Sequence, residues 1–389
     1  MNLFDLVVFG GMIVAGIGGW RLGFITRVLS WAGLVVGLFA AVRLLPPLVK
    51  LLDLGEAGTL GLSLGLVFAG ALVGQAAGFT LGARWRPVAP VDEGASLDTV
   101  DRLAGAVAGV VGMLLIVWLL LPLLSGTTGD VARQVKTSEI AKQLDQRLPD
   151  PPDAVQSLRS FLGPGQFPEV FDSLQATPDV GPPPEASGLD GATATQAARS
   201  VVMILSESCG QVAEGTGWVI DDGLVVTNAH VVAGNDQPQV VRDDGERFDA
   251  DVVAFDPSRD IAVLAVSSFG RPALARGDAA AGDVGAVFGH PGGEPLRLAP
   301  ASVARVIDAT GRNIYGAPGA DREVLEMAAS LRPGDSGAPV IDPSGSVIGM
   351  VFAIATDRSG VAYALTMAEV DGVLAAGRSG ETQAGTCLR

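Results

Sequence analysis

Four long runs of apolar residues fill the first third of the chain and limit its possible folds more than any other feature. They extend over Leu3 to Gly19, Val28 to about Leu45, Leu60 to Gly82 and Leu103 to Leu124. Each is close to the ~20 residues with which an α-helix crosses the hydrocarbon core of a bilayer. The first run has no basic n-region and three more runs follow it, which argues against a cleaved signal peptide. We therefore expect a four-span membrane domain over residues 1–125.

The overall composition agrees with a chain that lies partly in lipid. Mean hydropathy is +0.40, and charged residues make up only 17% of the 389 residues, which is too apolar for an ordinary soluble protein. The formal net charge is −16. A nucleic-acid partner would need a basic stripe, so none is expected, and the acidic balance favours solubility without indicating a substrate.

Lysine and arginine in the short loops predict the orientation of the membrane domain, because cytoplasmic loops carry the excess of positive charge. The first and third loops, with the foot of the fourth span, carry five such residues against two in the second loop: Arg21, Arg27, Arg84, Arg86 and Arg102 against Arg43 and Lys50. This places the N-terminus and everything after Leu124 outside the cytoplasm. The expected location is the cytoplasmic (inner) membrane, with the later half in the periplasm.

Glycines recur every fourth residue in the third span, from Gly70 to Gly82, and in shorter series in the second and fourth spans. Small residues at this spacing line one helix face and let backbones approach closely, so we expect tight helix packing. Asp5 and Arg43 are the charges within the spans, too few for a transport path to be favoured.

The composition changes after the fourth span. Residues 126–190 are rich in proline, with helical spacing of apolar residues at Ile140, Leu144 and Leu148, and are interpreted as a helical and proline-rich linker. Residues 191–389 contain short runs rich in Val and Ile, separated by Gly, Asp and Pro turns, which favours an all-β barrel or sandwich. Thr366 and Glu369 are spaced as a capping box that predicts a helix to about Ala376.

The sequence Gly334-Asp335-Ser336-Gly337-Ala338-Pro339 is suited to present a serine nucleophile on a tight turn. Gly334 allows a backbone conformation that a Cβ would obstruct. The N–H groups of Gly334 and Ser336 are then candidate donors to the oxyanion that forms when a carbonyl is attacked. Asp335 is expected to make turn or ion-pair contacts, with no part in proton transfer.

A base and its orienting carboxylate precede this turn. His230, one of two histidines in the chain, follows the apolar strand Val225 to Thr227, and Asp260 precedes the apolar run Ile261 to Leu264. A buried aspartate that accepts from imidazole Nδ1–H fixes the tautomer that takes the serine proton on Nε2. The chain order histidine, aspartate, serine is the order of the chymotrypsin-type proteases.

The two cysteines, Cys209 and Cys387, both lie in the later half. They are either two free thiols or a bridge, and a bridge is favoured if this half lies outside the cytoplasm.

The residues around the candidate triad resemble a known family. Gly215 to Ile220, Val226 to Val232, Asp260 to Leu264 and Gly334 to Val340 are similar to trypsin-like proteases of the HtrA branch. Across nearly its full length the chain resembles the membrane-anchored periplasmic acid-resistance proteases of mycobacteria. Those proteins join a membrane region like that of colicin V production proteins, whose signature resembles Asp98 to Gly105, to a chymotrypsin-fold domain.

The resemblance implies a four-helix transmembrane bundle followed by a double β-barrel of chymotrypsin type. It also implies a His230, Asp260 and Ser336 triad, a Cys209–Cys387 disulfide, and a role in tolerance of acid and oxidative stress. A specificity pocket is implied with Ser330 at its floor and Phe352, Ala353 and Ile354 along its wall. Since no acidic residue is evident at that floor, we expect apolar or mixed residues, and no strict Arg/Lys preference, before the cleaved bond.

Two positions depart from the family pattern. Ala338 replaces the second glycine of the usual Gly-Asp-Ser-Gly-Gly-Pro sequence, which alanine tolerates unless φ is positive. His290 lies in a Gly/Pro loop where tyrosine is common, and a structural or surface role is expected for it.

The sequence thus predicts a membrane-tethered serine endopeptidase that acts on peptides or proteins of the cell envelope and needs no cofactor or metal. Two alternatives remain: a catalytically silent module that keeps the protease fold, and a membrane scaffold in which the helices carry the function. Neither the natural substrate nor the oligomeric state follows from the sequence.

Overall fold

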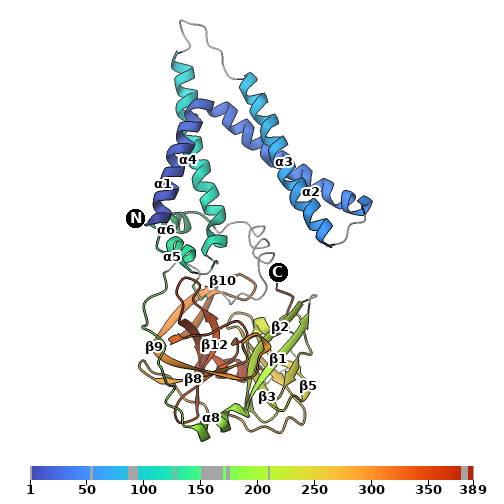
Figure 1. Ribbon diagram of the computed structural model, residues 1–389, viewed down its shortest axis with the longest axis vertical. Coiled ribbons are helices and arrows are strands. Elements are labelled where there is room, and N and C mark those ends of the chain that lie inside the picture. Colours follow the sequence, from blue (N-terminus) through green and yellow to red (C-terminus); the bar gives the residue numbers. More distant parts are fainter. Residues whose placement is uncertain are drawn as a thin grey trace. The chain divides into compact units, whose positions relative to one another are not determined.

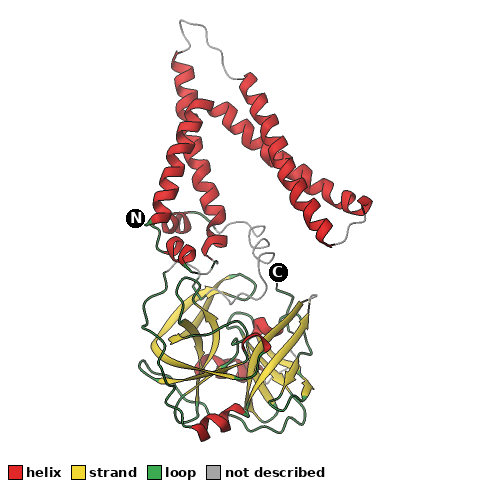
Figure 2. Ribbon diagram, in the orientation of Figure 1, coloured by secondary structure: helices red, strands yellow, loops and turns green. Residues whose placement is uncertain are grey.

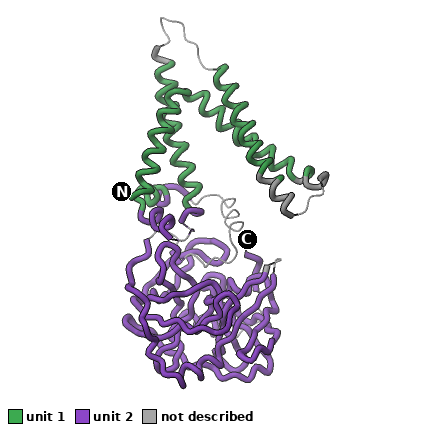
Figure 3. The backbone as a smooth tube through the Cα atoms, in the orientation of Figure 1, with its two compact units in different colours: residues 1–121, 138–144 green, residues 122–137, 145–389 purple. Residues whose placement is uncertain are grey.

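The computed structural model describes residues 2–52, 56–85, 95–125, 127, 129–149, 170–171, 176–208, 211–377 and 384–388. The chain divides into two compact units, shown in Figure 3. One comprises residues 1–121 with 138–144, and the other comprises residues 122–137 with 145–389. All the β-strands belong to the second unit (Figure 2).

Four long helices form most of the first unit: α1 (Leu3–Leu22), α2 (Phe24–Leu52), α3 (Glu56–Trp85) and α4 (Ala95–Ser125). Each contains a stretch long and apolar enough to cross a membrane, as the sequence predicted. Many of their Leu, Val and Phe side chains are exposed in the isolated chain, as expected of surfaces that face lipid.

Glycines let these helices pack at close range. A Cβ built on Gly37 of α2 would lie 2.0 Å from the carbonyl oxygen of Gly70 in α3, and one on Gly74 would lie 2.2 Å from that of Gly33. The prediction that the glycine series mark helix contacts is therefore confirmed. The carboxylate of Asp5, a charge in the first span, accepts from the hydroxyl of Ser138 at 2.6 Å just before α6 (Glu139–Arg147), which suits a structural role.

The first of two sheets in the second unit has seven antiparallel strands in the order β5-β4-β1-β2-β3-β7-β6. It follows α5 (Asp130–Lys136) and α8 (Gly191–Ala198), and the short helix α9 (Ala229–Val232) comes after β3. The strands are β1 (Val201–Ser208), β2 (Gln211–Asp221), β3 (Leu224–Thr227), β4 (Gln239–Val241), β5 (Arg247–Asp249), β6 (Asp251–Asp256) and β7 (Ile261–Ala265).

The second sheet is a closed barrel with the order β10-β13-β12-β11-β8-β9. Its strands are β8 (Val284–Gly289), β9 (Arg297–Arg312), β10 (Pro318–Ala329), β11 (Pro339–Ile341), β12 (Val347–Ile354) and β13 (Val361–Thr366). A short 3₁₀ turn, η1 (Pro291–Gly293), follows β8, and α10 (Met367–Gly377) follows the last strand. In Figure 1 the first sheet runs from green to yellow and the barrel from orange to red.

Side chains from both sheets share one buried core. Trp218 and Val226 of the first sheet belong to the same apolar cluster as Phe288 and Phe352 of the barrel, and all four are fully buried. Burial of about 150–250 Å² by each aromatic ring makes such residues dominant contributors to packing. The two sheets are therefore joined by a continuous apolar core.

Two strands were not anticipated from the sequence. β5 has three residues, Arg-Phe-Asp, which alternate polar and apolar but are too few for the alternation to be recognised, and it pairs only with β4 at the sheet edge. β13 is buried at all six positions, and Ala362 and Ala364 weaken the β-propensity of its sequence. Helix α10 occurs where the sequence predicts it, but not through the expected capping box. Thr366 Oγ1 is buried without a hydrogen-bond partner among the described residues, and Glu369 instead accepts from the N–H of Glu323 at 2.9 Å.

Part of the segment before the sheets packs on the barrel. Lys136 of α5 donates to Asp357 in the β12–β13 turn at 2.9 Å. Thr177 donates to the same carboxylate through its N–H at 2.9 Å and its hydroxyl at 2.6 Å. Asp357 is 4% exposed. Burial tends to raise the pKa of this carboxyl, but the bonds from Thr177 and Lys136 outweigh burial and hold the pKa below its usual value.

Candidate active site

The turn that carries Ser336 lies between β10 and β11. Gly334 has φ +97°, a conformation that disfavours any residue with a Cβ. A Cβ there would lie 2.4 Å from the amide nitrogen of Gly292 and 2.6 Å from the carbonyl oxygen of His290. The Gly292 N–H in turn donates to the Pro333 carbonyl at 2.9 Å. The turn therefore packs closely against the loop after β8, and only glycine fits at position 334.

The backbone N–H groups of Gly334 and Ser336 have no acceptor among the described residues, whereas the neighbouring amides of Asp335 and Gly337 donate to Arg332 and Val351. Ser336 is 4% exposed. Buried backbone donors are nearly always satisfied, so two open amides on one turn need an explanation. They are the two groups that the sequence proposes as oxyanion donors.

His230 and Asp260 form a close pair beside the first sheet. His230 lies in α9 directly after β3, and Asp260 directly precedes β7, the strand that pairs with β3. The imidazole Nδ1 is 2.7 Å from Asp260 Oδ2, and the His230 backbone N–H donates to Oδ1 at 2.9 Å. The Asp260 carboxylate is fully buried while the imidazole is 13% exposed. The carboxylate thus accepts twice from one residue, which fixes the ring with Nε2 directed away from Asp260.

Asp260 itself has an unusual backbone conformation. Its φ is +59°, in the left-handed region that aspartate tolerates better than most residues. The side-chain amide of Asn228 donates to the Asp260 carbonyl at 2.8 Å. Asn228 also precedes the helix that carries His230, so one residue connects the two halves of the pair.

Thr216 of β2 joins the serine turn to the first sheet. Its N–H donates to the Ser336 carbonyl at 2.8 Å, and its hydroxyl donates to the Gly334 carbonyl at 2.8 Å. A Cβ on Gly337 would lie 3.2 Å from the backbone nitrogen of Asn228. The structure therefore brings the serine turn against the segment that leads into His230. Thr216 was not singled out from the sequence as a site residue, although the Gly215 to Ile220 motif contains it.

Asp335 and His290 make hydrogen bonds that connect the serine turn to neighbouring segments. The Asp335 carboxylate accepts from the Arg332 N–H at 2.9 Å and from Arg297 at 3.3 Å, in agreement with the expected turn and ion-pair contacts. Burial raises the pKa of Asp335, and these partners oppose that shift. The N–H of His290 donates to Thr216 Oγ1 at 2.9 Å, and its Nδ1 lies 3.0 Å from the Glu294 carbonyl oxygen. Burial lowers the pKa of His290, which suits a neutral structural ring.

The implied specificity residues occupy different environments. Ser330, at the end of β10, is exposed, and its carbonyl accepts from Arg297 at 3.0 Å. Phe352 and Ala353 of β12 are fully buried, and Ile354 is half-buried. The Phe352 ring lies in the core beneath the guanidinium of another residue, Arg322, 5.4 Å from the ring centroid. Only the backbone of Phe352 is thus suited to line a pocket. Ala338 is buried and does not have positive φ, as expected.

The cysteine pair lies only partly within the described residues. Cys209 is outside them, and Cys387 is in the described C-terminal tail. The flanking contacts converge on one loop: Ser208 donates to the Ala233 carbonyl at 3.0 Å, and the Ala384 N–H donates to Asp236 at 2.8 Å.

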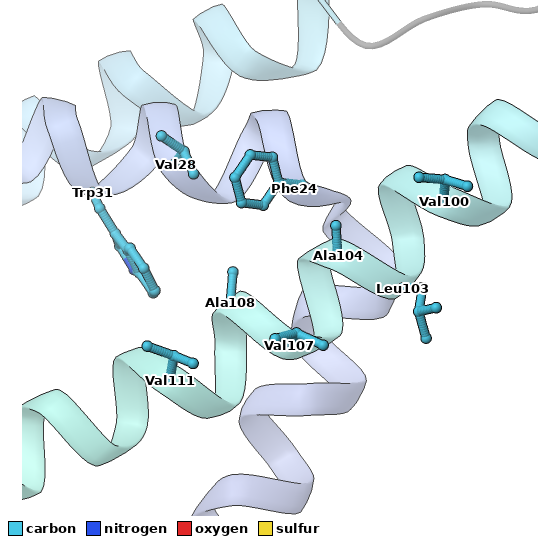
Figure 4. Close-up of a pocket in the computed structure, with 9 residues that line it drawn as sticks. All are labelled: Phe24, Val28, Trp31, Val100, Leu103, Ala104, Val107, Ala108 and Val111. Carbon is cyan, nitrogen blue, oxygen red and sulfur yellow. The ribbon is translucent and has the colours of Figure 1, made fainter.

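The first unit contains an apolar pocket of about 570 Å³ between α2 and α4. Figure 4 shows its lining, which includes Phe24, Trp31 and Val107. Among the described residues that line it, none carries a group suited to acid–base or nucleophilic chemistry, so it is not a candidate for hydrolysis.

Comparison with known families agrees with this division. Residues 4–149 match the family described as colicin V production protein, and residues 215–350 match the family described as trypsin-like peptidase domain. Part of the chain is 37% identical to a probable periplasmic serine endoprotease, DegP-like, of Brucella suis, over 163 residues that cover 40% of this chain and 31% of the relative.

The fold and these matches define a trypsin-like serine protease with a membrane domain at its N-terminus. The serine protease Rv3671c of Mycobacterium tuberculosis is 34% identical over 396 residues, which cover 99% of this chain and 98% of the relative. The crystal structure of the Rv3671c protease in its active form superposes with a TM-score of 0.51 at 38% identity, covering 57% of this chain and all of that one. The chain belongs to the family of this protease.

Proposed function

We propose that the chain is an extracytoplasmic serine endopeptidase in which Ser336 is the nucleophile, His230 the general base and Asp260 the residue that orients it. The observation that carries the proposal is the 2.7 Å contact between His230 Nδ1 and the buried Asp260 carboxylate, beside the Ser336 turn. A lone pair on Nε2 is then available to accept the serine proton.

The proposed reaction proceeds in two stages. Ser336 Oγ attacks the carbonyl carbon of the substrate while its proton passes to His230 Nε2, which then protonates the leaving amine. In the second stage a water molecule gives a proton to the same nitrogen and attacks the ester carbon. The bond to Ser336 Oγ then breaks, and His230 returns the proton to Ser336 Oγ as the acid product leaves. Asp260 stabilises the imidazolium that forms in each stage and keeps its own negative charge.

The open N–H groups of Gly334 and Ser336 are proposed as the oxyanion hole. Donors fixed in place before reaction stabilise developing charge without reorganisation, and loss of one such donor costs about 3 kcal/mol of barrier. The close packing of Gly334 against the loop after β8 supports this role, because it fixes the peptide that carries the first donor.

Labelling with a fluorophosphonate probe tests the assignment without a known substrate. The full chain in detergent is expected to react at one site, and Ser336→Ala to lose the label while its thermal unfolding is unchanged. Labelling that persists in the alanine variant would assign the reactivity to another residue. Absence of labelling in folded protein would favour the catalytically silent module.

We also propose the primary pocket: Ser330 at its floor and the β12 segment at Phe352, Ala353 and Ile354 along its wall. The Ser330 carbonyl accepts from the Arg297 guanidinium, which also pairs with the Asp335 carboxylate, so the described contacts of Ser330 provide no uncompensated anion for an Arg or Lys side chain. Apolar or mixed residues are therefore expected before the cleaved bond. A cleavage profile from a peptide library dominated by Arg and Lys would contradict this.

We propose that the protease domain, residues 191–389, lies in the periplasm and that residues 126–190 link it to the membrane helices. The proposed physiological role of the enzyme is resistance of the cell envelope to acid and oxidative stress. The distribution of Lys and Arg among the loops supports this orientation. In intact spheroplasts, an added protease should degrade the part of the chain that contains both β-sheets, here called the sheet domain, and should leave the four long helices intact. Protection of the sheet domain until lysis would reverse the topology.

A Cys209–Cys387 disulfide is proposed within the sheet domain. The contacts of Ser208 and Ala384 with the 233–236 loop support it, because they bring the adjoining segments to one place. Intact mass with and without reductant tests the bond, and an unchanged mass indicates free thiols. Reduction is expected to lower activity, since the bridge would hold the first strands to the C-terminal tail.

A further inference from the structure

Arg322 is a buried cation that the proposed mechanism does not use. It lies in β10 and is 2% exposed. Its Nε donates to the Ser258 carbonyl at 2.7 Å, and its Nη2 donates to the Arg312 carbonyl at 2.8 Å. No carboxylate among the described residues lies within ion-pairing distance of it, and Nη1 is buried without a hydrogen-bond partner in the same part of the chain.

Burial of such a charge is strongly unfavourable unless nearby groups compensate it. Burial accordingly lowers the pKa of Arg322, and the carboxylates of Asp260, Asp256 and Glu369 act against that shift, with Asp260 the strongest of the three. The guanidinium also lies over the Phe352 ring. The cation therefore lies in the field of the buried carboxylate that pairs with His230.

The hydrogen bond from Arg322 to the Ser258 carbonyl contacts the turn that carries the Asp260 carboxylate. Ser258 lies in the turn between β6 and β7, which ends at Asp260. Hydrogen bonds within the turn stabilise it: the Asp256 side chain accepts from the N–H groups of Ser258 and Arg259 at 2.8 Å each. The positive φ of Asp260 indicates that further contacts hold its conformation.

Those further contacts come from the closed barrel and from α10. Arg259 donates to Glu369 of α10 at 2.6 Å, and Glu369 accepts from the N–H of Glu323, the residue next to Arg322. The Ile314 N–H donates to the Pro257 carbonyl at 3.1 Å. The barrel that contains Ser336 thus holds the turn that carries Asp260, and Arg322 is the fully buried member of these contacts.

We infer that Arg322 is a positioning residue for the reaction, which holds the Ser258 carbonyl and supplies positive charge to the Asp260–His230 pair. Its hydrogen bond sets the Asp260 turn relative to the serine barrel. Its positive charge attracts the Asp260 carboxylate and opposes the positive charge of an imidazolium at His230. This inference rests on the proposed triad.

The charged groups around the pair come from several elements. Around His230 of α9 and its partner Asp260 these are Asp256 and Arg259 of the β6–β7 turn, Arg312 of β9, Arg322 and Glu323 of β10, and Glu369 of α10. Arg259 is engaged by Asp256 and Glu369 at the surface, and the Arg312 side chain donates to the Gly316 carbonyl. Arg322 is the cation among them that is buried and without a direct carboxylate partner.

The test is the pH dependence of the second-order rate of fluorophosphonate labelling, measured on the full chain in detergent. Arg322→Gln keeps a polar side chain but removes the charge, and we expect the acid limb of its profile to move up by about half to one pH unit. Its plateau rate should fall by about tenfold, because small displacements of a reacting group reduce rates strongly. Arg322→Lys keeps the charge, so its acid limb should match the wild type while its plateau falls.

Arg305→Gln is the matched control. Arg305 is an arginine of the same barrel that pairs with buried Glu326 at 2.8 Å, so its loss destabilises the barrel without altering the charge beside Asp260. Its acid limb should match that of the wild type. A wild-type acid limb in Arg322→Gln, or an equal shift in Arg305→Gln, overturns the inference.

Two further outcomes are informative. If Arg322→Gln does not fold, the lysine variant decides: a shifted acid limb in Arg322→Lys contradicts the inference, and an unshifted limb with a reduced plateau supports it. If the wild-type chain does not label at Ser336, the triad itself fails. That result is distinct from a labelled enzyme whose profile is insensitive to Arg322.

Discussion

Replacement of Gly334 by alanine tests how the serine turn is built. The added Cβ would lie 2.4 Å from the Gly292 amide nitrogen, 2.6 Å from the His290 carbonyl oxygen and 2.9 Å from Pro291 Cα. All three neighbours are backbone atoms, so no side chain can rotate away. The turn must instead move by about 1 Å, and φ of +97° is itself unfavourable for alanine by about 1–2 kcal/mol.

The expected consequence is loss of one oxyanion donor. The peptide N–H of residue 334 would turn away from the developing charge, and such a loss lowers rates by about 10²–10³-fold. The measurement is the second-order rate of fluorophosphonate labelling at neutral pH, with the thermal unfolding midpoint recorded for each protein.

Gly319→Ala separates the clash from the backbone conformation. Gly319 also has positive φ, at +83°, but an added Cβ would meet nothing within 4 Å. It should lower the unfolding midpoint by a few degrees, at about 2–4 °C per kcal/mol, and label at the wild-type rate. A folded Gly334→Ala protein that labels as fast as the wild type would refute the reasoning, as would an equal loss of rate in Gly319→Ala.

Three further predictions follow from contacts elsewhere in the chain. Asp260→Asn should retain its fold and lower the labelling rate by about 10⁴-fold, since the amide stabilises the wrong imidazole tautomer; a rate near that of the wild type would remove Asp260 from the triad. Asp357→Asn should lower the stability of the sheet domain by roughly 1–3 kcal/mol at neutral pH in chemical denaturation. Because the folded pKa of Asp357 is depressed, its contribution is present above the ordinary value of 3.8 and is lost as the pH falls below it; the difference between wild type and variant should therefore shrink in acid, and a constant difference would contradict this. Gly74→Val should reduce the thermal stability of the helices in detergent by about 1–3 kcal/mol, through contact with the Gly33 carbonyl at 2.2 Å, whereas Gly65→Val in the same helix meets nothing within 4 Å and should match the wild type.

The limits of sequence reasoning are visible at particular residues. β13 was missed because Ala362 and Ala364 weaken its β-propensity, and β5 because three edge residues are too few for a pattern to be recognised. The helix after β13 was expected from a capping box, but its Glu369 contacts Arg259 and the Glu323 N–H across the fold. Each departure is a long-range contact that local spacing does not encode.

The sequence by itself determined the membrane helices, the β-rich second half and the identity of the candidate triad. Those features depend on local properties: the length of an apolar run, the turn residues, and a motif in a fixed chain order. Only the tertiary structure decided that Thr216 joins the serine turn to the first sheet, and that Arg322 reaches from the barrel to the turn of Asp260. Arg322 and Ser258 lie 64 positions apart in the chain, and their contact exists only because burial of the shared apolar core brings the two sheets together.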